Sequence, residues 1–265
     1  MSEYKSIDLT TFDKEEWWGK LEPFWKIIFK KSIDFKYLSE AFVPNDIDLD
    51  NILNLTVLDI DADFHKKGSI NNLYPLMFLK KLKVIKCWNN KISDLTPLSN
   101  LKNLQRLDFS RNNIRDLSPL KKLTNLKKLN FDYNVINDLS PLVNLKNLYR
   151  LSFNNNKIID LHPLLNLKKL QVLWINNNEI TNLTPLSSLI ELQTLGLDNN
   201  KITSLTPLSS LIELQMLGCR NNKINDLVPL ANLSKIKNVW CYGNQITEEN
   251  LEEFKKAWAD NHVAM

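Results

Sequence analysis

Several side chains in this sequence have the chemistry that catalysis or metal binding needs. The histidines and cysteines, which could supply a nucleophile, a base or a metal ligand, are His65, His162, His262, Cys87, Cys219 and Cys241. Two carboxylates, Asp108 and Asp132, could form the pair that general acid–base catalysis requires. The cysteines lack the C-x₂-C spacing that is typical of a zinc site. Whether any of these groups meet depends on the elements that hold them.

The sequence repeats itself with a period of 22 residues. An asparagine stands two residues before an apolar residue in each unit, at Asn90, Asn112, Asn134, Asn156, Asn178, Asn200, Asn222 and Asn244. The apolar frame moves with the asparagines, and no insertion interrupts it between Ile85 and Ile246. Such a period is typical of a solenoid, in which each structural unit stacks on the next.

Each unit combines a strand pattern with a turn pattern. The alternation of Leu107, Asp108 and Phe109 predicts a short strand with its apolar side chains inward. The next segment has apolar residues at every third position and a proline, which predicts a 3₁₀ turn. We expect the Ser or Thr before most of these prolines to cap the turn with its hydroxyl. We expect a looser turn at Val228, which has no hydroxyl.

The repeated asparagine suits the bend between strand and turn. Its side-chain amide both donates and accepts hydrogen bonds, so it can satisfy buried backbone groups within one unit and between units. Stacking the units therefore predicts an asparagine ladder.

The pattern LxxLxxLxLxxNxIxDLxPL resembles that of internalin-like leucine-rich repeats, a class that shares features with eukaryotic phosphatase-regulator repeats. The resemblance covers residues 55–246, as one irregular unit followed by eight regular ones. It implies an α/β fold, a right-handed leucine-rich-repeat solenoid with a concave parallel β-sheet and convex 3₁₀ turns. In bacterial relatives of this type, the concave face usually binds another protein.

Residues 1–54 are expected to form a helical N-terminal cap over the exposed end of the solenoid. Asp13 and Glu16 suggest a capping box, Pro23 should divide the segment into two helices, and a further helix is expected at about 46–53. An apolar stripe at helical spacing comprises Trp17, Leu21, Phe24, Trp25, Ile28 and Phe29. The stripe could be a partner-binding surface, but an uncapped solenoid end favours a role in the core of the cap.

Residues 247–265 are expected to form a C-terminal helical cap that begins after Thr247. The first rung is irregular because it carries the insertion at 61–69. No part of the sequence outside the caps and repeats resembles a second domain.

The repeat frame predicts which strand residues point outward on the concave face. We expect these residues to bind a partner protein: Trp88, Arg106, Asp132, Tyr133, Arg150, Val172, Trp174, Asn176, Gly196, Asp198, Met216, Gly218, Arg220, Trp240 and Tyr242. The types enriched here, Trp, Tyr, Met and Arg, are those of interface anchors.

The N-terminal half of this face is charged, through Arg106, Asp108, Arg111, Lys128, Asp132 and Arg150. One interpretation is a solvated lattice of ion pairs between neighbouring strands. The other is a docking patch for the charged side chains of a partner. The sequence favours the ion-pair lattice.

The C-terminal half suggests a groove. Trp174 and Trp240 would stand about 14 Å apart, three strand spacings, with Gly196 and Gly218 between them as a floor without side chains. The groove would accept a bulky side chain or loop of the partner. The alternative is that the second glycine is a copied surface residue without a binding role. Units 181–202 and 203–224 match at 18 of 22 positions, which indicates a duplication.

The repeat frame also predicts whether the histidines, cysteines and carboxylates named above can come together. It keeps the histidines apart, places the cysteines at inward strand positions and surrounds Asp108 and Asp132 with basic residues. Cys219 and Cys241 lie on neighbouring rungs, close enough in principle for a disulfide, but we expect both to act as small buried hydrophobes. We therefore expect no catalytic residues, no metal and no cofactor.

The composition supports a binding module. The formal net charge is +4 from 34 basic and 30 acidic residues, which disfavours nucleic acid and membrane surfaces as partners. No signal peptide or membrane span is visible, so a cytoplasmic location is expected, with export by a non-classical route as the alternative. The resemblance to internalin-like repeats implies a bacterial scaffold, which we expect to be monomeric. The function predicted is non-enzymatic protein binding through the concave sheet. The alternatives are a regulatory subunit or inhibitor of an enzyme, and a host-directed effector or adhesin of the internalin type.

Overall fold

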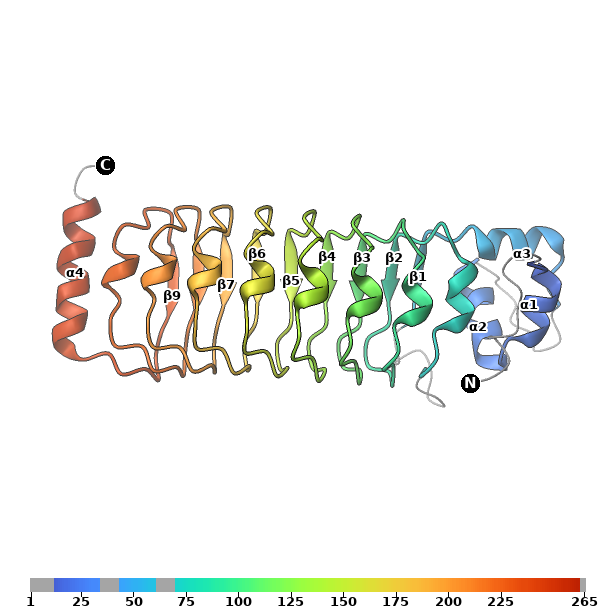
Figure 1. The fold of residues 1–265 in the computed structure, drawn as a ribbon, viewed down its shortest axis with the longest axis horizontal. Coiled ribbons are helices and arrows are strands. Elements are labelled where there is room, and N and C mark those ends of the chain that lie inside the picture. Colours follow the sequence, from blue (N-terminus) through green and yellow to red (C-terminus); the bar gives the residue numbers. More distant parts are fainter. Residues whose placement is uncertain (1–11, 34–42, 61–69, 263–265) are drawn as a thin grey trace.

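The computed structural model describes residues 12–33, 43–60 and 70–262, which form an elongated stack of similar rungs (Figure 1). Each rung contributes one three-residue strand to a parallel sheet whose order follows the sequence, β1 to β9. The strands are β1 Val57–Asp59, β2 Val84–Lys86, β3 Arg106–Asp108, β4 Lys128–Asn130, β5 Arg150–Ser152, β6 Val172–Trp174, β7 Thr194–Gly196, β8 Met216–Gly218 and β9 Asn238–Trp240.

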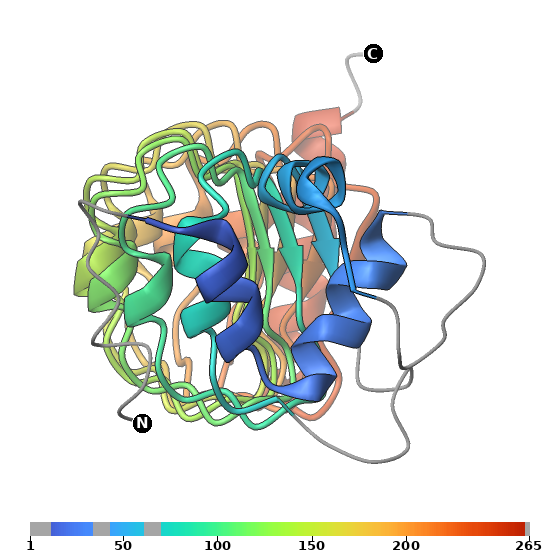
Figure 2. The same ribbon diagram turned by 90° about the vertical axis from the view of Figure 1, so that its right-hand side faces the viewer.

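A 3₁₀ helix covers the opposite side of most rungs. These helices are η3 Tyr74–Phe78, η4 Thr96–Leu98, η5 Ser118–Leu120, η6 Ser140–Leu142, η7 His162–Leu164, η8 Thr184–Leu186, η9 Thr206–Leu208 and η10 Val228–Leu230. Viewed along the stack, the sheet and the 3₁₀ helices lie on opposite sides of the rungs (Figure 2). The predicted solenoid, with a concave sheet and convex 3₁₀ turns, is confirmed.

The predicted hydroxyl caps of the 3₁₀ helices are wrong. The Ser or Thr is the first residue of the helix, and its backbone N–H donates to a side chain two residues earlier, as from Ser140 to Asp138 (2.8 Å). This arrangement is an Asx turn, and it also forms at Val228, whose N–H donates to Asp226 (2.7 Å). Helix η10 therefore forms without a hydroxyl, and the looser turn predicted at Val228 is not found. The acidic residue of DLxPL, rather than the hydroxyl, therefore starts the turn.

Leucine side chains from both sides of each rung fill the space between sheet and 3₁₀ helices. The side chains of Leu104, Leu107 and Leu120 in one rung are almost wholly buried, and the same positions are buried in the rungs around it. Three phenylalanines stack along the core, with ring centroids 5.8 Å apart for Phe109 and Phe131 and 5.7 Å apart for Phe131 and Phe153. Burial of this continuous apolar row holds each rung to its neighbours.

The predicted asparagine ladder is confirmed. The side-chain oxygen of Asn178 accepts the N–H of Ile158 in the preceding rung (3.0 Å). Its amide group donates to the carbonyls of Phe153 (2.9 Å) and Ile175 (3.1 Å). Each repeated asparagine thus satisfies backbone groups of two rungs that have no strand partner at the bend.

Three helices cap the N-terminal end: α1 Lys14–Lys20, α2 Pro23–Ser32 and α3 Asp46–Leu53. Asp13 caps α1 by accepting the N–H groups of Glu15 and Glu16, and Pro23 stands at the start of α2, where it needs no N–H donor. Of the predicted stripe, all but the partly buried Phe24 belong to the buried core. The inserted segment 61–69 lies outside the described residues.

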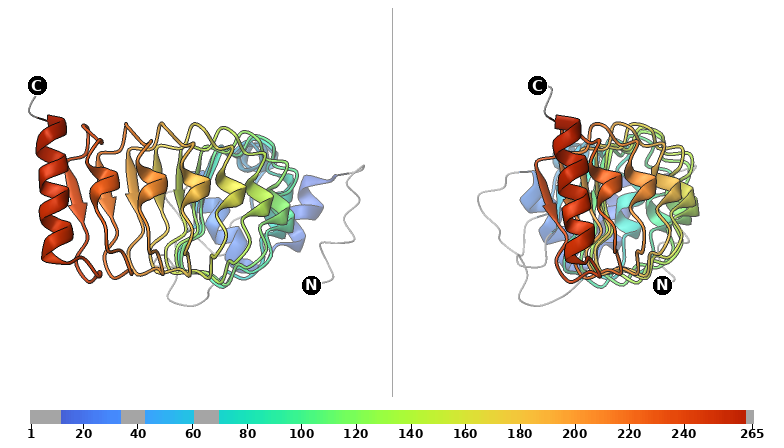
Figure 3. Two further views of the ribbon diagram at one scale, coloured as in Figure 1. Left: turned by 60° about the vertical axis from the view of Figure 1, so that its left-hand side comes forward. Right: turned by 90° about the vertical axis from the view of Figure 1, so that its left-hand side faces the viewer.

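Helix α4, Glu248–His262, crosses the last rung (Figure 3). Thr247 precedes it, and its hydroxyl accepts the N–H of Asn250 (3.2 Å), as an N-cap does. Phe254 and Trp258 face the core and are partly buried there. Among the described residues, no helix combines the length and apolarity needed to cross a bilayer.

Candidate functional site

The parallel register places three outward columns on the concave face, as the repeat frame predicts. Arg106, Lys128 and Arg150 pair directly across β3, β4 and β5 and belong to the first column. Trp174 and Gly196 pair across β6 and β7 in the middle column, which continues through Gly218 to Trp240. The third column follows two residues after it and includes Asp132, Asn154, Asn176, Asp198, Arg220 and Tyr242.

The expected bare floor between the two tryptophans is not present at Gly196. A side chain built there would collide with the Trp174 ring, whose Cζ3 lies 2.8 Å from the position of the added Cβ. Trp174 therefore lies across Gly196, and the glycine is buried. The sequence could place both residues in one column, but the direction of the ring depends on its rotamer.

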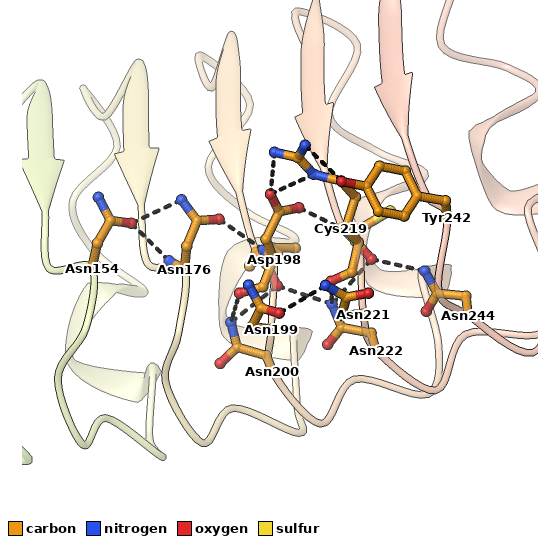
Figure 4. Close-up of polar contacts among 12 residues, drawn as sticks. Asn154, Asn176, Asp198, Asn199, Asn200, Cys219, Asn221, Asn222, Tyr242 and Asn244 are labelled. Atoms are coloured by element: carbon orange, nitrogen blue, oxygen red, sulfur yellow. Dashed lines mark hydrogen bonds and ion pairs between the residues drawn. The ribbon is translucent and has the colours of Figure 1, made fainter.

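At Gly218, the carboxylate of Asp198 occupies the space, since its Oδ1 lies 3.1 Å from an added Cβ. Asp198 forms an ion pair with the guanidinium of Arg220 (2.6 Å) (Figure 4). The same guanidinium donates to the hydroxyl of Tyr242 (3.2 Å) and lies 5.3 Å from the centre of the Tyr242 ring. The hydrogen bond from Arg220 to Asp198 raises the pKa of Arg220. The two glycines thus make room for neighbouring side chains of this protein.

The third column forms a second polar ladder, which the sequence analysis missed. The side-chain oxygens of Asp132, Asn154 and Asn176 each accept the backbone N–H of the residue 22 positions later, at 2.7–2.8 Å. Asp198 continues the series by accepting the N–H of Arg220 (2.8 Å). These residues support the rim of the sheet, whatever they also bind. The run of Asp and Asn residues in this column of the sequence could have predicted the ladder.

The predicted ion-pair lattice in the N-terminal half is wrong. Asp108 accepts hydrogen bonds from the hydroxyl of Ser110 (2.8 Å) and the amide of Asn130 (3.1 Å). Asp132 accepts from the hydroxyl of Ser152 (2.7 Å) as well as from Asn154. Both carboxylates therefore accept hydrogen bonds from neutral donors of their own or the next rung, and neither forms an ion pair with the basic residues.

The cations of the first column have no carboxylate partner. Within the described parts of the chain, Arg106 and Arg150 form no side-chain hydrogen bond or ion pair, and both are exposed. Lys128 lies over the ring of Tyr149, 5.2 Å from its centre, and also pairs with no acid. Three positive charges therefore stand side by side on the sheet.

A hollow of about 400 Å³ opens over these strands. Its lining combines three cations, two carboxylates, three neutral polar residues, two leucines and one tryptophan: Arg106, Lys128, Arg150, Asp108, Asp132, Asn130, Ser152, Asn154, Leu107, Leu129 and Trp174. The groove predicted between Trp174 and Trp240 lies in the other half of the face. The prediction did not include Asn130 and Ser152 of the middle column or Asn154 of the third column.

Arg111 and Tyr133 occupy an unusual backbone position at the edge of the same half. Both have positive φ angles (54° and 55°), at a position where the later rungs have Asn or Gly. Asparagine is favoured at a positive φ angle, whereas Arg and Tyr have no such backbone preference. The Arg111 guanidinium stacks on the exposed Tyr133 ring, 4.4 Å from its centre. Trp88, at the N-terminal end of the third column, is half-buried.

In the part of the chain that the structure describes, the histidines, cysteines and carboxylates do not come together in one cluster. His162, the first residue of η7, contacts Asp160, and hydrogen bonds from its backbone N–H and its ring lower the pKa of Asp160. His65 lies outside the described residues. Cys219 and Cys241 are free thiols, and burial raises the pKa of Cys219 to about 12. Among the residues described, no three His, Cys, Asp or Glu side chains form a metal-binding group.

A second cavity, of about 360 Å³, lies between α4 and the last rung. Its lining is mainly apolar: Leu227, Ile236, Lys237, Val239, Cys241, Leu251, Phe254, Lys255 and Trp258. It marks incomplete packing of the C-terminal helix on the solenoid end.

Comparisons with known proteins agree with this fold. Residues 80–122 and 168–210 match the family model described as leucine-rich repeats (2 copies). A search of curated protein sequences gives no significant match.

The solved structures similar to this chain include proteins from two bacteria. Internalin C2 of Listeria monocytogenes is 33% identical with a TM-score of 0.72, over 81% of this chain and 91% of that one. The internalin InlF of the same species is 28% identical with a TM-score of 0.69, over 82% and 68% of the two chains. A leucine-rich-repeat protein of Leptospira interrogans is 26% identical with a TM-score of 0.72, over 82% of this chain and 56% of the other.

The repeat frame, the nine-stranded parallel sheet and the identity to internalin C2 lead to one conclusion. The chain belongs to the internalin-like leucine-rich-repeat proteins.

Proposed function

We propose that this protein is a non-enzymatic module that binds a partner protein through the concave face of its sheet. The observation that carries the proposal is the exposure of large side chains on that face. Tyr242 is 65% exposed, Tyr133 49%, Trp240 42% and Met216 36%. Exposing such side chains to water costs free energy, and these residue types dominate the buried centres of protein interfaces.

The rigidity of the face supports the same proposal. Asp198, Arg220 and Tyr242 are joined by hydrogen bonds across neighbouring rungs. A side chain that is already held in place loses little conformational entropy when a partner binds. The concave face therefore offers anchors that are ordered before binding.

The carboxylates support a scaffold rather than an enzyme. Asp108 and Asp132 accept hydrogen bonds from Ser and Asn side chains of the sheet, so their oxygens serve the rim of the solenoid. We propose that the chemistry of this chain is limited to recognition.

A selection experiment tests the proposal. Protein fragments displayed on phage would be selected on the folded protein, and dissociation constants measured for the best binder. Trp240→Ala/Tyr242→Ala should weaken binding at least tenfold, which is the cost expected for interface anchors, at about 1.4 kcal/mol for each tenfold change. The control Ile190→Ala/Ile212→Ala removes two exposed apolar side chains from turns that precede the strands, and should leave the affinity unchanged.

The result that would overturn the proposal is equally direct. If the control pair weakens every selected binder and the concave pair weakens none, the binding face is not the sheet. Circular dichroism of both variants would confirm that each remains folded.

A further inference from the structure

We propose that the N-terminal half of the concave face binds an acidic segment of the partner protein, through Arg106, Lys128 and Arg150. This inference rests on the proposed function, since it names the chemistry of the partner on the same face. These three residues form what is called the cation column below.

The cation column is unfavourable for the isolated protein. Arg106 pairs with Lys128, and Lys128 with Arg150, on adjacent strands that lie about 4.8 Å apart. Like charges directly opposite one another destabilise a sheet. Valines stand at both ends of the run, at Val84 and Val172, so the charges are confined to three neighbouring rungs.

Among the described residues, no acid forms an ion pair with the column. Asp108 and Asp132 are the nearest carboxylates on the face, and Ser and Asn side chains occupy their oxygens. Elsewhere on the sheet an acid does pair with the neighbouring cation, as Asp59 does with Lys86 (2.6 Å) and Asp198 with Arg220 (2.6 Å). The guanidinium groups of Arg106 and Arg150 thus keep all their donors for a ligand.

The hollow over the column gives a ligand a place to lie. Its volume of about 400 Å³ accommodates several side chains, and its walls carry the three cations along one column. The Tyr149 ring beneath Lys128, 5.2 Å from its Nζ, holds that ammonium group near the surface. A carboxylate in the hollow would meet two cations at once and relieve their repulsion.

An acidic protein segment fits better than a nucleic acid. Two strand spacings span only about 10 Å, which is room for two or three charges rather than for a tract of phosphates. The net charge of +4 is too small for a general nucleic-acid surface.

Binding of synthetic peptides tests the inference. The probes are a short peptide that alternates glutamate with serine, its glutamine counterpart, and an oligothymidylate of equal charge. Binding would be followed through the Nε–Hε NMR signals of Arg106 and Arg150 at low salt. We expect the glutamate peptide to shift these signals and the glutamine peptide to leave them in place.

Matched variants locate the binding. Arg106→Gln/Lys128→Gln/Arg150→Gln should weaken the glutamate peptide about tenfold, because each exposed charge pair contributes only part of that factor. Lys121→Gln/Lys122→Gln/Lys146→Gln removes the same charge from exposed convex positions and should have no effect. Equal losses in the two triple variants, or no binding to the native protein, would overturn the inference.

Two further outcomes separate this inference from the proposed function. Preference for oligothymidylate over the glutamate peptide, with dependence on the cation column, would replace the acidic protein segment by a nucleic acid. Selected phage binders that depend on Trp240 and Tyr242 but tolerate the loss of the cation column would leave the proposed function intact and end the inference.

Discussion

Trp174 and Gly196 show where reasoning from single residues succeeds and where it stops. The repeat frame predicts that Gly196 faces outward and leaves no hole in the core, and the register of β6 and β7 agrees. The frame cannot predict that the Trp174 ring turns over the glycine, because that choice depends on rotamer energies and close contacts. Cross-strand packing therefore explains the glycine better than an open groove does.

Gly196→Ala tests this packing. The added methyl group would collide with the Trp174 ring, so the free energy of unfolding should fall by about 1–2 kcal/mol. In a Trp174→Ala background the same change should cost less, because the ring clash is gone and only the Asn176 amide, 2.9 Å from the added Cβ, must shift. Urea unfolding of the four proteins measures the difference. An equal cost in both backgrounds would show that the ring is not responsible.

Asn178→Leu tests the asparagine ladder at a central rung. The change removes one acceptor and the donors to three backbone carbonyls in a buried site, so unfolding should become about 3–4 kcal/mol easier. Asn166→Leu, at an exposed convex position, serves as the control and should cost less than about 0.5 kcal/mol. Similar costs at both positions in chemical denaturation would contradict the ladder's role.

At the scale of elements, the periodicity predicts the strands and 3₁₀ helices well because the same frame recurs without insertion. Its error lies at the start of each 3₁₀ helix. Rules for α-helices put the cap at the residue before proline, whereas that residue is the first of the short helix and the cap lies two residues earlier. Sequence alone does not reveal this shift, since both Asp138 and Ser140 are good capping types.

A pair of substitutions in η6 measures the shift. Asp138→Ala removes the acceptor for the Ser140 N–H and should destabilise the protein by about 1 kcal/mol. Ser140→Ala removes only a hydroxyl that donates to Asp138 (2.8 Å) and should cost a few tenths of that value. Thermal unfolding of the two variants gives the ranking, and a larger loss for Ser140→Ala would restore the hydroxyl cap.

At the scale of the whole molecule, both caps could be predicted because a solenoid end exposes apolar residues that only a helix stripe can cover. The position of the concave hollow could not be predicted, because it depends on how the side chains of the three outward columns pack against each other. Lys128, Asn130, Ser152 and Asn154 join the hollow for this reason. The frame predicts which face is available, but the hydrogen bonds decide which charges remain unpaired on it.

Deletion of residues 203–224 tests the modular character of the molecule. The deletion removes one complete rung, which nearly duplicates the rung before it, and joins Ile202 to the next unit in frame. We expect a folded protein that loses the stability of one repeat and its interface, a few kcal/mol. Deletion of 203–213 breaks the frame and should abolish cooperative unfolding, as followed by circular dichroism. Loss of folding in the full-rung deletion would contradict the solenoid account.

The central claim is that the concave face binds a partner protein, and oxidative footprinting of the complex with a selected binder tests it most directly. Hydroxyl radicals modify exposed Trp, Tyr and Met side chains rapidly and exposed Leu and Ile side chains more slowly, and mass spectrometry locates the modified residues. The account predicts that binding protects Tyr133, Met216, Trp240 and Tyr242, all exposed on the concave side, while the exposed convex residues Ile159 and Leu165 react as before. Protection confined to the convex residues, with the concave aromatic residues unchanged, would contradict it.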